Sequence, residues 1–395
     1  MCFASDLTYS DRIYELTKIE GDISMKYFKY VLAFISCTLL IVLSNSAFAK
    51  SDIVPGGPWI TDNQHVSLER LSDYSQLYKQ LRKIEKKSKG LVELEPIGVS
   101  NEGRIIWLTK IGNPDNERVM IITQQHGNEA LTTESALKII KFLASDSNKA
   151  KQILNYLHVL IVPRVNPDGH EVYHRYNIDE DAPARNTDEG FYTAREEGIG
   201  WDINRYHWVT DWKESTLYQN HPSEYPTNPV PEAVAVIDAY NEYNEDDSPI
   251  IWIADFHHQG TYVTEDGENV TSSILWPRNE NVVTDIVNLS KQLCVTIYDH
   301  MSQYGYSTVT LYPGGTYAGI ARNGYGLAGS GSILVELKGG IGQKSSGMLI
   351  KHAYEQMMSI LEATADGTLY DVKPERSEEI PPRGDYYYKE LPPEE

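Results

Sequence analysis

Residues 119–143 read VMIITQQHGNEALTTESALKIIKFL, and this stretch decides the fold. Its first part, Val119–Ile122, is short and continuously apolar, which is typical of a strand buried on both faces. Its last part, residues 136–143, repeats apolar residues at helical spacing. The tetrapeptide HGNE at 126–129 lies between them. The stretch therefore predicts a strand-to-helix unit that carries a histidine and a glutamate at its junction.

Short apolar strands alternate with helical stretches along much of the chain. We expect strands at 91–97, 105–111, 119–123, 159–162, 250–254 and 333–335. We expect helices at 68–87, after residue 129, and at 231–243, 283–304 and 347–363. This order predicts a single α/β domain with a mixed, mainly parallel, twisted sheet and helices on both faces. The polar segment 166–212 lacks periodicity, which indicates a long functional loop.

The composition indicates a globular domain with a segment at each end that is not part of it. The chain is 41% hydrophobic, with 28 glycines and 19 prolines. Residues 1–49 are interpreted as a leader with a signal peptide, whose true start is Met25 and whose cleavage site follows Ala49. The alternative is an uncleaved anchor. We expect the catalytic domain at 50–365 and a flexible, acidic, Pro-rich tail at 366–395. The leader predicts a secreted or periplasmic protein.

The charge and the cysteines limit the partners of the chain. A formal net charge of −21 argues against nucleic acid and anionic membranes. No segment after the leader is long enough to span a membrane. Of the three cysteines only Cys294 follows the leader, so we expect no intrachain disulfide and a buried, structural thiol. We expect a monomer.

Polar clusters follow three of the predicted strands. They are HGNE at 126–129, DFHH at 255–258, and Glu336. Ligands of open α/β sheets bind beyond the carboxyl ends of the strands, so we expect these clusters to converge. Two histidines and Glu129 would give one zinc ion three ligands and an open position for water, whose pKa zinc lowers to about 7. Glu336 is then placed to be the base. The alternative is that these residues are surface or helix-capping groups.

Several short motifs occur in order along the predicted domain. They are IGVSNEGR at 97–104, HxxE at 126–129, NPDG at 166–169, DINR at 202–205, DFH at 255–257, LY at 311–312 and VEL at 335–337. In order and spacing they resemble those of zinc metallocarboxypeptidases of the carboxypeptidase A type, and the resemblance runs from about Leu68 to Ala363. It implies that family's fold, one bound zinc ion, and peptide substrates with a free C-terminal carboxylate.

The resemblance also implies a role for individual residues. The zinc ligands would be His126, Glu129 and His257, with Glu336 as general base and acid. The substrate's carboxylate would be held by Asn204 and Arg205 and covered by Tyr312. Asp202 would orient His126. Arg185 would stabilise the oxyanion, with Arg175 and Arg195 nearby, and His258 is an alternative ligand to His257.

Two features separate the chain from the pancreatic enzymes of that family. Asn128 stands where those enzymes carry an arginine, and segment 312–336 is rich in glycine. Side-chain specificity therefore stays open, and Arg322 could either meet an acidic side chain or lie at the surface. Two other functions remain as alternatives: a zinc-dependent N-acyl amino acid deacylase, and a non-catalytic binding protein on the same fold.

Overall fold

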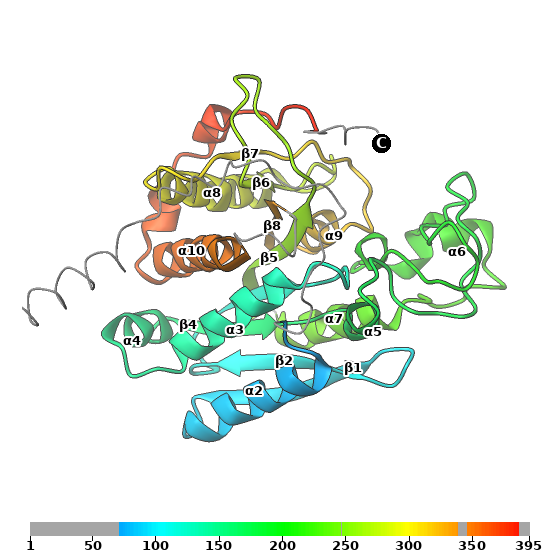
Figure 1. Ribbon diagram of the computed structural model, residues 1–395, viewed down its shortest axis with the longest axis horizontal. Coiled ribbons are helices and arrows are strands. Elements are labelled where there is room, and N and C mark those ends of the chain that lie inside the picture. The colour runs from blue at the N-terminus through cyan, green and yellow to red at the C-terminus, as the bar shows by residue number, and fades with distance from the viewer. Residues whose placement is uncertain (1–70, 246, 339–345, 387–395) are drawn as a thin grey trace, which may run out of the picture. The chain divides into compact units, whose positions relative to one another are not determined.

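A mixed sheet of eight strands lies at the centre of the computed structural model, which describes residues 71–245, 247–338 and 346–386 (Figure 1). The strand order is β1-β2-β4-β3-β5-β8-β6-β7. The strands are β1 (Val92–Val99), β2 (Ile105–Ile111), β3 (Glu117–Thr123), β4 (Leu157–Val162), β5 (Ile250–Gln259), β6 (Ser272–Leu275), β7 (Val309–Leu311) and β8 (Gly331–Lys338). Strands β4, β3, β5 and β8 are parallel, whereas β1, β2 and β6 pair antiparallel with their neighbours towards the centre.

Helices cover both faces of this sheet (Figure 1). The longer ones are α2 (Tyr74–Lys87), α3 (Leu131–Leu143), α7 (Pro231–Tyr243), α8 (Thr284–Met301) and α10 (Ser346–Ala365). The shorter ones are α4 (Asn148–Leu154), α5 (Pro167–Glu171), α6 (Thr216–Asn220) and α9 (Ala321–Leu327). Side chains of β3 alternate between two apolar cores. Val119 and Ile121 join the core of α2, α3, α8 and α10, and Met120 and Ile122 join that of α7 and α9. The predicted α/β fold with a mixed sheet is confirmed.

Local sequence explains where the first helix begins. The side chain of Asp73 accepts a hydrogen bond from the backbone N–H of Gln76, whose side chain accepts one from the Asp73 N–H. This capping box satisfies N–H groups that the helix leaves unpaired. The helix therefore starts at Tyr74, later than predicted, and the predicted start at residue 68 lies outside the described residues.

Two strands run further than the sequence pattern predicted. Strand β5 continues through Gln259, and β8 through Lys338. His257 and Glu336 therefore lie inside paired strands rather than beyond their ends, which corrects our prediction. The cause is that Phe256 and Leu337 are buried apolar residues next to His257 and Glu336, and they keep β5 and β8 paired through these polar positions. Strands β6 and β7 were not predicted, because they are short and rich in serine and threonine.

Residues 366–386 fold against the domain, so the prediction of a flexible tail is wrong for them. Two 3-10 turns, Thr368–Asp371 and Pro374–Glu379, occupy this segment. Leu369 and Ile380 are buried in the core of α8 and α10, which supplies the physical reason. The backbone N–H of Leu311 in β7 then donates to Pro381 O at 2.7 Å. Residues 387–395 and the leader lie outside the described residues.

Two further expectations concern single features of the described residues. Cys294 is buried in α8, as predicted. Within the described ranges, no helix has both the length and the apolar character that a membrane crossing needs.

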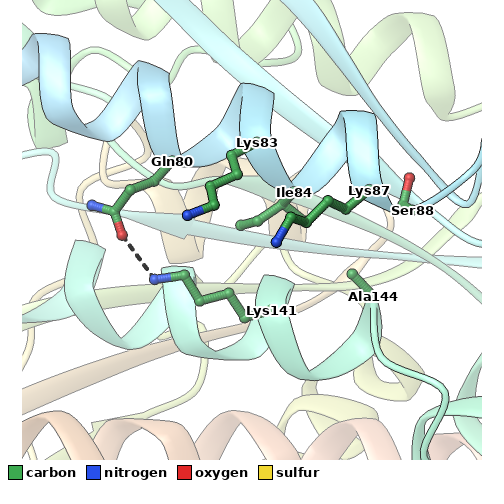
Figure 2. Close-up of a pocket in the computed structure, with 7 residues that line it drawn as sticks. All are labelled: Gln80, Lys83, Ile84, Lys87, Ser88, Lys141 and Ala144. Atoms are coloured by element: carbon green, nitrogen blue, oxygen red, sulfur yellow. Dashed lines mark hydrogen bonds between the residues drawn. The ribbon is translucent and has the colours of Figure 1, made fainter.

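A hollow of about 310 Å³ lies between α2 and α3 (Figure 2). Its lining includes Lys83, Lys87 and Lys141, and Lys141 Nζ donates to Gln80 Oε1 at 2.8 Å. The lining contains no histidine, cysteine or carboxylate, so the hollow lacks the usual ligands of a zinc ion.

Candidate active site

Neighbouring central strands bring the polar clusters to one end of the sheet. The loop after β3 carries His126 and Glu129, and β5, which pairs with β3, carries His257. In the parallel pairing of β5 with β8, His257 lies opposite Glu336. Opposite residues of a parallel pair point to the same face of a sheet. Strand register therefore places the predicted base next to a predicted metal ligand.

The loop that carries the first cluster packs tightly against a second loop. A Cβ atom added to Gly127 would lie 2.1 Å from the carbonyl carbon of Gly169, so only glycine fits there. The side chain of Asn166 accepts a hydrogen bond from Gly169 N at 2.8 Å, which shapes the second loop. The Gly127 N–H donates to Arg175 O at 3.2 Å. The NPDG motif thus supports the backbone beneath the first cluster.

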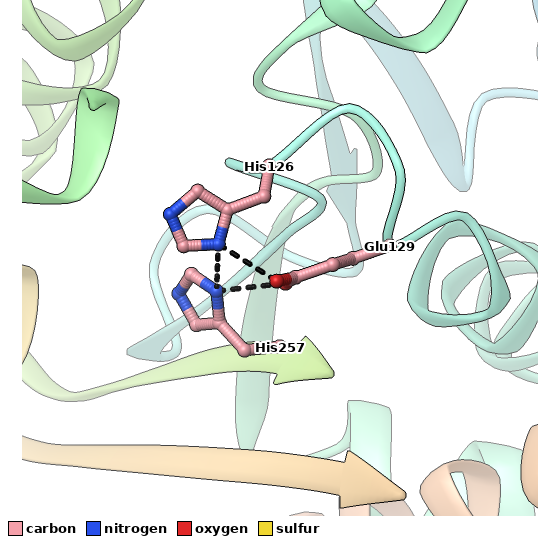
Figure 3. A group of neighbouring side chains, drawn as sticks. All are labelled: His126, Glu129 and His257. Atoms are coloured by element: carbon pink, nitrogen blue, oxygen red, sulfur yellow. Dashed lines mark hydrogen bonds and ion pairs between the residues drawn. The ribbon is translucent and has the colours of Figure 1, made fainter. Parts of the chain in front are cut away.

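Three side chains converge on one point (Figure 3). His126 Nδ1 lies 2.8 Å from Glu129 Oε1, and His257 Nδ1 lies 2.9 Å from Glu129 Oε2. The two Nδ1 atoms are 3.0 Å apart. All three side chains are buried. Burial opposes the charge on Glu129, but the two imidazoles hold its pKa well below the usual range. Glu129 is therefore a charged carboxylate although the point of convergence is screened from water.

Two aspartates fix the outer nitrogen of each imidazole. His126 Nε2 lies 3.1 Å from Asp202 Oδ1, and His257 Nε2 lies 2.8 Å from Asp255 Oδ2. Burial raises the pKa of Asp202, but Arg175 and Arg205 hold it well below its usual range, so this group is a carboxylate. A carboxylate only accepts hydrogen bonds, so each Nε2 carries the hydrogen. With a metal ion at the shared point, both Nδ1 atoms would offer it their lone pairs.

This donor set fits a zinc ion. Two neutral imidazole nitrogens and one carboxylate oxygen are ligands that zinc accepts in catalytic sites. A tetrahedral zinc ion with bonds of about 2.0–2.1 Å needs ligand atoms roughly 3.3 Å apart, a few tenths of an ångström wider than these. Without a metal ion, burial lowers the pKa of His257 but Asp255 and Glu129 raise it well above its usual range, so a proton takes the place that the cation would occupy. His126, Glu129 and His257 could therefore hold one metal ion.

Glu336 is buried beside this group. Its Oε2 atom makes no hydrogen bond to any described residue. Burial raises the pKa of Glu336 to about 8, with His257 acting against the rise and Glu129 adding to it. A divalent cation at the shared point would lower this pKa towards neutrality, because it stabilises the carboxylate. A carboxyl group near neutral pKa can both accept and donate a proton.

The arginine beside the metal-binding group is Arg175, and the structure does not bring Arg185, the arginine that we predicted, to this group. Arg175 Nη2 donates to Asp202 Oδ2 at 3.2 Å, and its Nη1 lies 3.7 Å from Glu129 Oε1. Its side chain is 37% exposed and therefore open to a ligand. Arg185 is exposed and forms no hydrogen bond or ion pair with any described residue of this cluster. The physical reason is the hydrogen bond from Gly127 N–H to Arg175 O, which joins the long loop to the HGNE loop at residue 175. The loop therefore meets the site ten residues before the position that we predicted.

Asn204 and Arg205, which we predicted to bind the substrate's carboxylate, follow Asp202 in the chain, and Tyr312 follows strand β7. Arg205 is 29% exposed and donates from Nη1 to Asn204 O at 2.7 Å. Asn204 is buried, with its Oδ1 accepting from Ala321 N at 2.8 Å and its Nδ2 donating to Asp255 Oδ2 at 3.4 Å. Tyr312 is partly buried, and both burial and Glu336 raise its pKa. Arg205 is therefore the accessible donor, whereas Asn204 already uses both ends of its amide.

Sequence reasoning missed two contributors to the site. Asp255 was named only as part of a cluster, although Asp255 and His257 are two residues apart on one strand and therefore share a face. Arg383 was assigned to the tail, and no local signal could have found it. Its guanidinium carbon lies 4.6 Å from the ring centre of Tyr312, and its Nη1 donates to Gln259 Oε1 at 2.8 Å.

Comparisons with known proteins show which family and fold this chain resembles. A family model described as "Zinc carboxypeptidase" matches residues 77–340. The catalytic chain of human carboxypeptidase N is 29% identical over 143 residues, which is 33% of this chain and 29% of that one. A zinc carboxypeptidase from Saccharothrix mutabilis subsp. capreolus is 36% identical over 89 residues, 20% of each chain. The chain thus spans less than a third of the curated relatives it matches.

Solved structures share the fold. Bovine thrombin-activatable fibrinolysis inhibitor, in complex with tick carboxypeptidase inhibitor, aligns with a TM-score of 0.54 and 17% identity over 77% of this chain and 99% of that one. Carboxypeptidase A from Helicoverpa armigera aligns with a TM-score of 0.53 and 17% identity over 79% and 78%. At this identity the likeness concerns the fold alone.

Proposed function

Since the chain belongs to the zinc carboxypeptidase family, we propose that it hydrolyses the last peptide bond of peptides with a free C-terminal carboxylate. The observation that carries this proposal is the convergence of two Nδ1 atoms and one carboxylate, with Asp202 and Asp255 fixing the outer nitrogens. Such a set binds a divalent cation and has little other use in a buried position. The enzyme is accordingly a zinc-dependent hydrolase that uses one ion.

His126, Glu129 and His257 are the proposed zinc ligands. Zinc bound there would acidify a water molecule and polarise the carbonyl group of the substrate. Asp202 and Asp255 keep the hydrogen of each imidazole on Nε2, which leaves both Nδ1 atoms as ligands. The protein's part is thus to supply neutral imidazoles in a fixed orientation.

Glu336 is the proposed proton carrier. Its Oε2 takes the proton of the attacking water and then delivers it to the leaving nitrogen, so the carboxylate is restored at the end of each cycle. The orphaned Oε2 supports this role, since a proton or water partner would complete its hydrogen bonding. Burial excludes competing proton donors from bulk water.

Three further residues bind the substrate in this proposal. Arg205 pairs with the terminal carboxylate, because a planar guanidinium suits a carboxylate group. Arg175 donates to the carbonyl oxygen as it becomes negative. Tyr312 covers the bound residue. Asn204 is the second proposed partner of the same carboxylate, through the Nδ2 hydrogen that it does not donate to Asp255.

The setting of the enzyme is also part of the proposal. We place a signal peptide in residues 1–49 and the catalytic domain at 50–365, with residues 366–386 packed onto it. The protein acts as a secreted or periplasmic monomer on peptides. Its charge of −21 gives it no affinity for nucleic acid.

Metal analysis together with a peptide assay tests the proposal. Purified protein should bind one zinc ion per chain and release the last residue of N-blocked dipeptides. Glu336→Gln should bind the same zinc but lose on the order of 10²- to 10⁴-fold in kcat. Turnover of N-acyl amino acids alone would favour a deacylase. Equal activity of the two proteins, or no bound zinc, would refute the hydrolase.

A further inference from the structure

Arg322 is buried next to the proposed carboxylate site. It is the second residue of α9 and only 2% exposed, which decides between the two positions that the sequence left open. The preceding residue, Ala321, donates its N–H to Asn204 Oδ1 at 2.8 Å. Gly314 packs against the guanidinium, since a Cβ added there would lie 2.5 Å from Arg322 Nη2. The glycine-rich segment therefore makes room for this arginine.

The guanidinium of Arg322 lacks an anionic partner among the described residues. Its Nη2 donates to Gly315 O at 2.5 Å, and its buried Nε has no hydrogen-bond partner there. Arg104, by contrast, pairs with Asp168 at 2.7 Å. Burial lowers the pKa of Arg322 to about 10, so it still carries its charge at neutral pH. Burying a cation without an anionic partner destabilises the folded state, which indicates a functional role for Arg322.

The backbone around Arg322 belongs to the proposed site. Its guanidinium lies against Gly314 and Gly315, which follow Tyr312 in the chain, and its helix begins at the N–H that holds Asn204. The cation therefore lies beside the loop that carries Tyr312, which the proposed function sets over the last residue of the substrate. Arg383, the other arginine near Tyr312, also has a buried Nε without a partner among the described residues, but its Nη1 donates to Gln259 Oε1 and its guanidinium carbon lies 3.6 Å from the ring centre of Tyr262. Of these two arginines, Arg322 is the more deeply buried, and it makes no hydrogen bond to a described side chain.

We propose that Arg322 determines specificity by pairing with the side-chain carboxylate of a C-terminal glutamate or aspartate. This inference rests on the proposed function, because it assumes that the terminal carboxylate lies at Arg205. Arg205 would then bind the terminal carboxylate of the acidic residue, and Arg322 would bind its side-chain carboxylate. A neutral side chain would leave the buried cation unpaired, so it would bind less well.

The alternative is that Arg322 has only a structural role and holds the loop through its hydrogen bond to Gly315 O. Two peptides that differ only in Glu or Gln at the last position distinguish these two roles. We expect wild-type kcat/KM to be about 10- to 100-fold higher for the Glu peptide, since a buried charged hydrogen bond is at stake. Equal rates on both peptides would overturn the inference, and this measurement needs no variant.

Substitutions locate the preference. Arg322→Gln should lose most of the Glu preference while retaining hydrolysis of the Gln peptide, and Arg322→Lys should keep part of it. The matched control is Arg278→Gln, which removes the same charge from an exposed residue. The backbone N–H of Arg278 donates to Asn323 Oδ1, and the substitution leaves that N–H in place. It should leave the Glu/Gln ratio unchanged. An equal loss on both peptides in Arg322→Gln would assign the residue to loop structure instead.

A binding experiment separates this inference from the proposed function. Calorimetry with zinc-loaded Glu336→Gln protein measures the affinity for the same two peptides without turnover. Should wild type hydrolyse neither peptide, the proposed function fails, and Arg322-dependent binding of the Glu peptide still supports the inference. If wild type hydrolyses both peptides and the Glu336→Gln protein binds them with equal affinity, the inference is wrong and the proposed function stands.

Discussion

Asp255→Asn isolates the effect of one buried charge on metal affinity. Asp255 Oδ2 accepts from His257 Nε2 at 2.8 Å, and both residues are at most 2% exposed. An asparagine keeps the shape and one acceptor oxygen but removes the charge that makes the imidazole a stronger ligand. A charge-assisted hydrogen bond in a buried position contributes about 1.5–3 kcal/mol. We therefore expect the Kd for zinc to rise by roughly 10- to 100-fold, in line with losses at comparable supporting residues.

Competition with a chromophoric chelator at fixed pH measures this Kd. The matched control is Glu232→Gln, which neutralises an equally buried carboxylate whose Oε2 accepts from Asn177 Nδ2 at 2.8 Å. This control should leave the zinc Kd unchanged. Circular dichroism of the zinc-free proteins checks that both variants are folded. A folded Asp255→Asn protein with wild-type zinc affinity would refute the reasoning that fixes the tautomer of His257.

Three other perturbations test separate parts of the structure. Burial raises the pKa of Glu232 to about 7, against an ordinary value near 4.5, so the folded state keeps a proton that the unfolded state loses. Wild-type stability should therefore fall by about 3 kcal/mol as pH rises from 4.5 to above 7, and urea unfolding of Glu232→Gln should show none of this loss. Arg175→Met should lower kcat by about 10²- to 10³-fold through the lost oxyanion donor, whereas Arg185→Met, the control, should match wild type in the same peptide assay. Ile380→Ala should reduce the free energy of unfolding by about 2–4 kcal/mol, and Ile380→Val by about 1 kcal/mol. An unchanged denaturation midpoint in Ile380→Ala would contradict the packing of this segment on α8.

The path of the long loop shows where sequence reasoning failed. Arg175 and Arg185 lie in a polar stretch without periodicity, so no local pattern distinguishes them. The choice depends on the Gly127 N–H bond to Arg175 O and on Asn166, whose Nδ2 donates to Tyr176 O at 3.0 Å. Such bonds join residues that are far apart or irregularly spaced, and a linear pattern does not contain them. The same holds for Arg383, which reaches Tyr312 only because Ile380 is buried.

The sequence by itself determined the types of element and the chemistry that they carry. Apolar runs and helical spacing record short-range packing, so Val119–Ile122, the helix after Glu129 and the helix at 231–243 could be read directly. The histidine and glutamate of residues 126–129 are neighbours on a single turn, and their pairing is local as well. Tertiary structure alone decided the register that sets His257 opposite Glu336 and the burial of Arg322 with no anionic partner in the described part of the chain. Those features depend on strands and loops distant in the chain, whose meeting is governed by long-range packing rather than by local sequence.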